Sequence, residues 1–404
     1  MTESDMSKST TWEMPSERLT LNFGPQHPAT HGTLRVEMEL DGEVVTRATP
    51  EIGYLHTGFE KLAEHMNYNQ FICVTDRMNY LSPICNNLAF ALSAEKLMDL
   101  EPPKRGQYER VIMAELTRIS DHQVAIGMQA LDIGAFTAFL YLFQEREKLY
   151  DIFEMVTGSR LTTTYTRIGG VMRAMPDYCI AKIREFCAYF PRVLDECETL
   201  LNRNQIWLGR TVGVSAMSAE DSISYGLTGP CLRAAGVEWD IRKAEPYSSY
   251  EDFDFDIPIG KEGDVYDRYL VRMEEMRQSL RIIDQALNNL PDGPVNVDDA
   301  KVILPDKDDV YNTMEGLIHH FMITMQNHGA DIPEGEVYVP TEAPNGELGF
   351  FIVSTGGREP YRVHARPPSL YNYQIFQPTL EGRMLSDAVA IMGSLNVIAG
   401  ELDR

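Results

Sequence analysis

Side chains that can hold and transfer protons gather in a short loop near the start of the chain. Residues 24–32 (GPQHPATHG) combine His27 and His31 with two prolines and two glycines. Proline fixes its own φ and biases the preceding residue toward an extended conformation, while glycine permits a sharp reversal. The segment therefore predicts a stiff loop that holds His31 in place. An imidazole held in this way can exchange a proton near neutral pH.

Two further segments carry titratable groups. Tyr80 ends the segment DRMNY, and Asp132 lies in the segment LDIGA at the end of an expected helix. A phenol can donate a hydrogen bond and a proton, and a carboxylate can accept them. Each residue also has a purely structural interpretation: a loop-capping histidine, a half-buried tyrosine, and an exposed carboxylate at a helix end, where the dipole disfavours it.

The remaining histidines near these segments have a simpler interpretation. We expect His27, His56 and His65 to fix loops through hydrogen bonds, and His27 is also a candidate for lining a pocket beside His31.

Composition excludes several classes of protein. The chain of 404 residues has 60 acidic and 36 basic side chains, a formal net charge of −24, which argues against nucleic acid or an anionic membrane surface as a direct partner. No segment approaches the roughly 18 apolar residues of a membrane span, and the polar first twenty residues contain no secretory signal. We therefore expect a soluble chain that works on the cytoplasmic side, with residues 1–18 as a mobile tail.

The cysteine pattern predicts no metal centre. None of the six cysteines forms a Cys-x-x-Cys pair or a cluster with histidine at zinc spacing. The apolar, helical surroundings of Cys179, Cys187 and Cys197 are typical of buried thiols.

The elements that must position these groups follow from hydrophobic periodicity. Residues 19–48 read as two or three strands with a hairpin turn at Asp41–Gly42. Helical periodicity follows, and it predicts a central bundle of five helices. Their expected ranges are 61–71, 81–100, 108–131, 136–156 and 177–202.

The third of these helices is unusually polar for the middle of a bundle. Its segment carries buried-site candidates that need partners, because an unpaired buried charge is costly: Glu109, Glu115, Arg118, Asp121, His122 and Asp132.

The second half of the chain predicts a mixed organisation. Residues 209–258 look irregular and include an acidic, solvated run at 251–256, and helices are expected at 264–289 and 310–326. Strands at 336–340 and 347–355 with a turn at Asn345–Gly346, then a helix at 386–398, lead to terminal residues that we expect to pack specifically. The predicted fold is α+β: a β-rich subdomain (19–57), a helical bundle (58–290) and a mixed subdomain (291–404).

Four segments together resemble one family. Residues 24–32, the segment IGYLHTGFEK (52–61), DRMNY (76–80) and LDIGA (131–135) stand in the order and spacing of the D subunits of respiratory NADH-quinone oxidoreductase, complex I. The resemblance covers residues 19–404. It implies a quinone-reducing subunit of a proton-pumping enzyme, active only in the assembled complex.

This family is similar to the large subunit of nickel–iron hydrogenases, and the resemblance implies that fold. The hydrogenase cysteine pairs align with Asn79 and Ser82, and with Ile398 and Glu401. Nickel in such a site needs thiolate donors, so we expect no metal here and no hydrogenase activity.

In place of the metal, the resemblance implies a pocket for a quinone headgroup. Tyr80 and His31 would donate to the two carbonyls and supply protons, Asp132 would pair with His31, and His27 would line the pocket. The electrons would come from a four-iron four-sulfur cluster in the small iron–sulfur protein of the complex, its B subunit. The C subunit and the membrane-embedded H subunit are further implied partners, at the cytoplasmic side of the inner membrane.

Two positions depart from the family pattern. Thr57 stands where many relatives have arginine, and Thr162 where many have histidine, both near the cluster by family analogy. Losing a cation and a titratable group predicts a low, weakly pH-dependent cluster potential and hence menaquinone as acceptor.

Two other functions stay open at this stage. The chain could be a non-catalytic scaffold of a membrane-bound, hydrogenase-like complex, or part of an energy-converting hydrogenase, which bound nickel would reveal. His31, Tyr80 and Asp132 favour the quinone-reducing function.

Overall fold

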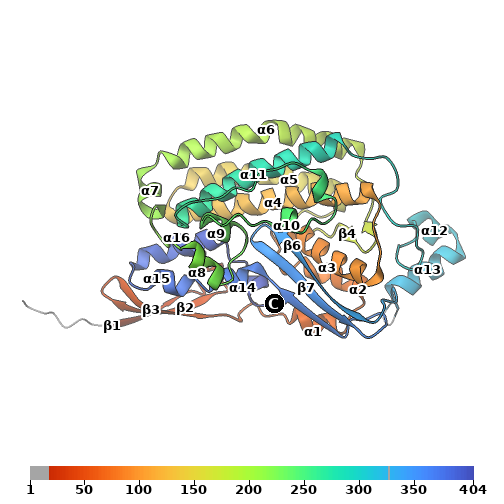
Figure 1. The fold of residues 1–404 in the computed structure, drawn as a ribbon, viewed down its shortest axis with the longest axis horizontal. Coiled ribbons are helices and arrows are strands. Elements are labelled where there is room, and N and C mark those ends of the chain that lie inside the picture. Colours follow the sequence, from red (N-terminus) through yellow and green to blue (C-terminus); the bar gives the residue numbers. More distant parts are fainter. Residues whose placement is uncertain (1–17, 326–327) are drawn as a thin grey trace, which may run out of the picture.

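The long helices lie side by side along one side of the molecule in the computed structural model, which describes residues 18–325 and 328–404 (Figure 1). They are α4 (Lys104–Ile133), α5 (Phe136–Thr157), α6 (Asp177–Asn202) and α11 (Val265–Asn288). Their buried faces share one hydrophobic core, in which α4 packs against both α5 and α11. The predicted helical bundle is therefore present, but α11 belongs to it and the helices of residues 58–100 do not.

The membership differs because residues 58–100 pack elsewhere. The single helix expected at 61–71 is two helices, α1 (Phe59–Ala63) and α2 (Tyr68–Thr75). Asn67 separates them, since its side chain caps α2 in a reciprocal pair with Gln70. The next helix, α3 (Pro83–Met98), packs on the C-terminal sheet instead of joining the bundle.

Two antiparallel sheets lie on the other side of the molecule (Figure 1). In the first, β2 (Arg35–Asp41) pairs with β1 (Arg18–Phe23) and β3 (Val44–Glu51), and the turn at Asp41–Gly42 is confirmed. The second contains β6 (Gly335–Ala343), β7 (Gly346–Ser354) and β8 (Arg362–Arg366). The predicted turn at Asn345 is confirmed, whereas β8 was not anticipated.

Short elements connect these layers, and several correct the sequence interpretation. The segment expected to be irregular contains α8 (Ala219–Ser224), α9 (Gly229–Ala234), α10 (Ile241–Ala244) and η2 (Tyr250–Asp252). The helix expected at 310–326 is interrupted at Thr313. The other short elements are η1 (Pro28–Thr30), β4 (Thr166–Arg167), β5 (Gly170–Val171), α7 (Gln205–Thr211), α12 (Lys307–Asn312), α13 (Met314–Thr324), α14 (Pro368–Tyr373), α15 (Phe376–Leu380), α16 (Leu385–Leu395) and α17 (Ala399–Leu402).

The acidic run at 251–256 is only half solvated. Asp254 and Asp256 are exposed and both pair with Arg281, while Phe253 and Phe255 between them are buried in the helical core. Alternation of acidic and aromatic residues therefore anchors this loop to α11.

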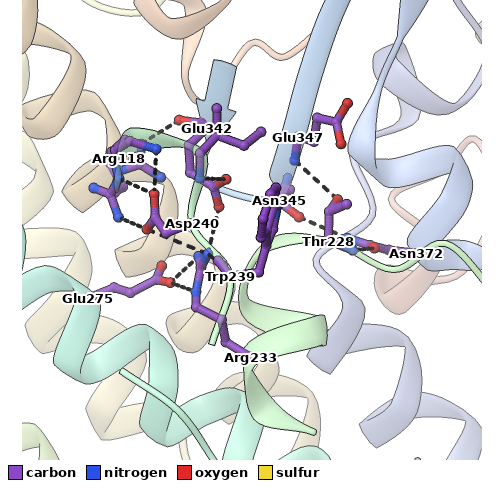
Figure 2. A network of polar contacts seen from close by, with 12 residues as sticks. Arg118, Thr228, Arg233, Trp239, Asp240, Glu275, Glu342, Asn345, Glu347 and Asn372 are labelled. Atoms are coloured by element: carbon purple, nitrogen blue, oxygen red, sulfur yellow. Dashed lines mark hydrogen bonds and ion pairs between the residues drawn. The ribbon is translucent and has the colours of Figure 1, made fainter. Parts of the chain in front are cut away.

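Buried charges run through the core along α4. Every charged group that the sequence placed on this helix from Glu109 to His122 is fully buried, and each has partners. Figure 2 shows the centre of the network, where Arg233 of α9 donates to Glu275 of α11 and Glu342 of β6. The prediction that these charges need partners is confirmed.

Cysteine burial also follows the expectation. Cys179 and Cys197 are buried and Cys187 is partly buried, all along α6. Burial raises the pKa of Cys179 to about 11 and of Cys197 to about 12, so both thiols stay protonated.

The expected tail lies outside the described residues up to position 17, and Arg18 begins β1. Within the described part of the chain, every helix is too short or too polar to span a bilayer. The subdomain boundaries stay a prediction.

Candidate functional site

The loop at 24–32 is fixed by its own hydrogen bonds. His27 caps the short helix η1, because its Nδ1 accepts from the backbone N–H of Ala29 at 3.2 Å. Its ring also lies 4.3 Å from that of Phe23, and Thr30 donates to the carbonyl of His27 at 2.9 Å. His27 thus has the loop-fixing role expected of it, and its possible part in a pocket stays a prediction.

His31 follows this helix with φ at 54°, in the left-handed region. Although part of the residue is exposed, its ring donates a hydrogen bond to the carbonyl of Val397, in the link between α16 and α17. Burial lowers the pKa of His31 and this hydrogen bond partly offsets the effect. The imidazole is therefore neutral near pH 7.

The C-terminal segment that His31 contacts also packs on the segment that carries Tyr80. Gly400 lies directly on the backbone there: a Cβ at this position would be 2.6 Å from the carbonyl oxygens of both Arg77 and Met78. Only glycine permits so close an approach. Residues separated by more than three hundred positions in the sequence thus form one structural unit.

Polar side chains hold this unit together. The side-chain amide of Asn396 donates to Asp121 at 2.7 Å and to Asn345 in the β6–β7 turn at 2.6 Å. Asn79 donates to the other oxygen of Asp121 at 3.4 Å and also interacts with Glu401. All five side chains are almost fully buried, so the network is shielded from solvent.

Tyr80 lies at the edge of this network. Burial raises the pKa of its phenol, and the carboxylates of Asp121 and Glu401 raise it further. Tyr80 therefore keeps its proton at neutral pH and is available as a hydrogen-bond donor.

Asp132 does not join these residues in the way expected. No hydrogen bond or ion pair links it to His31 among the described residues, and the pKa of His31 is lowered, where the expected pair would raise it. Asp132 stands at the end of α4, where burial raises its pKa to about 6. The predicted pairing is absent from this structure: the N–H of His31 is directed to the backbone carbonyl of Val397, and Asp132 does not influence its pKa.

The four positions expected to align with the hydrogenase cysteines do come together. Asn79 and Ser82 are buried before α3, and Glu401 lies on α17. The backbone N–H of Ile398 donates to the hydroxyl oxygen of Ser369, which in turn donates to Glu401. In the described ranges no three His, Cys, Asp or Glu side chains gather as a metal site would require.

Four members of the network were not singled out as site residues: Asp121, Asn345, Ser369 and Asn396. Asp121 carried a signal, as a charge in mid-helix. The other three carried none, because ordinary loop and helix-end polar residues are indistinguishable from solvated ones before the chain folds.

An exposed loop borders the site. Asp403 accepts the backbone N–H groups of Gly53 and Leu55 at 2.8 and 2.6 Å, and His56 bonds the carbonyl of Asp403 at 2.5 Å. This confirms that His56 fixes a loop and that the C-terminal residues pack specifically; the role of His65 stays a prediction. Ile52 and Tyr54 in the same loop leave about half of their surface exposed, 48% and 51%.

A cavity of about 400 Å³ lies between α3, the start of α4 and β6, and its walls include Glu95, Arg110 and Tyr247. None of the predicted site residues lines it. The site around Tyr80 is therefore separate from this cavity.

Comparison with known proteins identifies relatives over nearly the whole chain. Residues 132–404 match the family of the respiratory-chain NADH dehydrogenase 49 kDa subunit. The D subunit of the NADH-quinone oxidoreductase of Geotalea uraniireducens is 51% identical over 96% of this chain and 99% of its own length. The D subunit of Methylacidiphilum infernorum is 52% identical, over 96% and 92%, and the D 2 subunit of Rhizobium meliloti is 49% identical, over 96% of each chain.

Proposed function

The chain belongs to the family of the 49 kDa subunit of respiratory-chain NADH dehydrogenase, the D subunit of NADH-quinone oxidoreductase, and from this premise we propose that it binds and reduces the quinone beside Tyr80 and His31. One observation supports the proposal above the others. A protonated phenol and an imidazole border the same C-terminal segment, which also binds a loop with exposed apolar side chains.

The two residues have the chemistry that a quinone requires. A quinone ring carries two carbonyl oxygens, and its reduction to a quinol needs two electrons and two protons. Tyr80, kept protonated by burial and by its two carboxylate neighbours, donates to one carbonyl. A donor placed where negative charge develops stabilises that charge and then gives up its proton.

His31 donates to the second carbonyl only when it is charged. One ring N–H already bonds Val397, so the other nitrogen is an acceptor in the neutral imidazole. Negative charge on the quinone favours the charged imidazole and so opposes the effect of burial. Protonation of His31 is thus coupled to quinone reduction. Asp132, whose pKa is about 6, is a third proton-exchanging group at the end of α4.

The electrons come from a partner, which we propose to be the small iron–sulfur protein of the complex, the B subunit, with its four-iron four-sulfur cluster. The exposed apolar side chains of the loop at 52–55 form a surface for such a partner, next to the site. The C subunit and the membrane-embedded H subunit complete the proposed surroundings, at the cytoplasmic side of the inner membrane. There the chain works only as part of a proton-pumping complex.

We also propose the fold of the nickel–iron hydrogenase large subunit and the three predicted subdomains. The support is the contact of Gly400 with residues 77–78, which joins the two segments that align with the hydrogenase cysteine pairs. Thr57 and Thr162 favour menaquinone as the acceptor, by the loss of a cation and a titratable group. A redox titration that found a high, strongly pH-dependent cluster potential would contradict this choice.

Replacement of Tyr80 by phenylalanine tests the function. Tyr80→Phe removes the donor and keeps the ring, so NADH:quinone activity of the assembled complex should fall about 100-fold or more, in the range of general acid catalysis. NADH oxidation by a hydrophilic artificial acceptor and the amount of assembled complex should not change. Tyr338→Phe, which removes a partly exposed hydroxyl bonded to Glu347, is the matched control. Normal quinone turnover in Tyr80→Phe would favour the scaffold function.

A further inference from the structure

Two buried carboxylates, Asp121 and Glu401, lie beside Tyr80, and within the described part of the chain neither forms an ion pair. Asn79 interacts with both: its amide donates to Asp121 at 3.4 Å, and its presence lowers the pKa of Glu401. Two carboxylates this close in a dry site disfavour each other's ionised form, so one of them should hold a proton.

The polar groups around Asp121 and Glu401 determine which of the two carboxyls holds the proton. Asp121 accepts two amide N–H groups, and the guanidinium of Arg146 is near enough to interact with it.

Glu401 has much less support. Its Oε2 accepts from the hydroxyl of Ser369 at 2.6 Å, and its Oε1 is buried without a hydrogen-bond partner among the described residues. Burial, with Asp121 as the nearby charge, raises the pKa of Glu401 to about 7, against the lowering effect of Ser369 and Asn79. A buried polar atom without a partner is costly, so an oxygen left in this way points to a role beyond packing.

Side chains from three neighbouring elements influence the protonation of Glu401. Tyr80 and Asn79 face Glu401 from the segment before α3, Asp121 from α4 and Ser369 from α14. Asp403, on the same segment, instead binds the backbone at Gly53 and Leu55.

We propose that Glu401 is the proton reservoir of the quinone site: as a carboxylic acid, it returns a proton to Tyr80 after the phenol has given its own proton to the reduced quinone. This rests on the proposed function of Tyr80 and adds a residue to it.

Reduction of one quinone uses two electrons and two protons, and Glu401 supplies the proton that restores Tyr80. The quinone takes two electrons from the partner's cluster, one proton from Tyr80 and one from His31, and leaves as the quinol. His31 is neutral beforehand, so it first takes up that second proton from solvent as negative charge develops on the quinone. The O–H bond of Glu401 then breaks, directly or through one water, and the phenolate of Tyr80 regains its O–H bond. One negative charge moves from Tyr80 to Glu401, so the pair keeps its total charge. Water that enters after the quinol leaves protonates Glu401 again.

The first test replaces Glu401 in the assembled complex. Glu401→Gln keeps the size and an acceptor for Ser369 but has no proton to release. We expect quinone turnover to fall at least tenfold with the apparent quinone KM within about twofold, because binding is retained. The wild-type rate should decline as pH rises through about 7, where Glu401 ionises, and this decline should be absent in the variant. Glu401→Asp, which keeps a titratable group, should restore part of the turnover.

The second test shifts the titration without removing it. Ser369→Ala deletes a hydrogen bond that stabilises the ionised form, so the alkaline decline should move to higher pH. Ser93→Ala, which deletes a buried hydroxyl bonded only within α3, is the control and should leave the profile unchanged. An effect confined to folding would change the amount of assembled complex and not the position of the decline.

Wild-type turnover and pH profile in Glu401→Gln would overturn the proposal. Were that variant not to assemble, an unshifted profile in Ser369→Ala would overturn it equally. An inactive Tyr80→Phe beside a normal Glu401→Gln would leave the proposed function standing, whereas an active Tyr80→Phe would end both.

Discussion

Arg233 should be the most sensitive single position in the buried charge network (Figure 2). Its guanidinium donates to Glu275 and Glu342, each at 2.8 Å, lies 3.6 Å from Asp240, and is completely buried. Among the described residues of this network three arginines face four carboxylates, since Arg118 and Arg242 pair with Glu115 and Arg242 pairs with Asp240. Removing a cation therefore adds to an existing excess of negative charge.

The expected loss of stability follows from the carboxylates that remain when Arg233 is replaced. Arg233→Met keeps most of the apolar stem but leaves three buried carboxylates short of a partner, and breaking a buried pair in this way costs about 3–5 kcal/mol. Glu342→Gln should cost far less, about 1 kcal/mol, in the range of one ordinary hydrogen bond. The reason is that burial and the nearby Asp240 raise the pKa of Glu342, so this carboxyl is the one in the network that most readily becomes neutral.

Amide hydrogen exchange of the assembled complex, read by mass spectrometry, measures the difference. Loss of about 3–5 kcal/mol in local stability should speed exchange in α9 and α11 by a factor of roughly 100 to several thousand, at 1.4 kcal/mol for each factor of ten. Glu342→Gln should change it less than about tenfold. Equal exchange in the two variants would refute the charge argument.

Three further outcomes test the geometry of the site. Gly400→Ala should push the C-terminal segment off residues 77–78 at a cost of about 1–3 kcal/mol and raise the quinone KM, whereas Gly209→Ala, with open space around it, should not. Since the pKa of His31 lies below its usual 6.5, the charged form that donates to the quinone gains population only on acidification. The quinone KM should therefore fall as the pH is lowered through that region, and His31→Gln should abolish this trend. Asp403→Asn removes the charge from two hydrogen bonds to Gly53 and Leu55, so the loop at 52–58 should be cleaved faster in limited proteolysis, by the equivalent of about 1–2 kcal/mol.

Local sequence patterns predicted the hairpins and the long helices correctly, because each of these elements depends mainly on one short-range signal. Asp41–Gly42 and Asn345–Gly346 set the two hairpins, and long apolar periods gave α4, α5, α6 and α11. The errors have local causes too. Asn67 ends a helical period because its side chain caps the next helix, and β8 is too short and charged to stand out from a loop.

Within the site, residue types were predictable and their partners were not. His31, Tyr80 and Asp132 were assigned through the family resemblance, but the expected pair of His31 with Asp132 requires the two side chains to face each other. The chain instead brings the carbonyl of Val397 to His31, and burial leaves Asp132 with a raised pKa. A backbone acceptor of this kind leaves no trace in residue identity.

The sequence by itself determined the helices and hairpins, the family, and the residue types that can move protons, because these depend on short-range pattern and on matched segments. Only the tertiary structure decided which carboxyl keeps its proton. That choice depends on Gly400, which lets α17 lie against residues 77–78 and so encloses Glu401 next to Tyr80 and Asp121. A pKa is set by solvent exclusion and by neighbouring charges, and both exist only once distant segments are packed together.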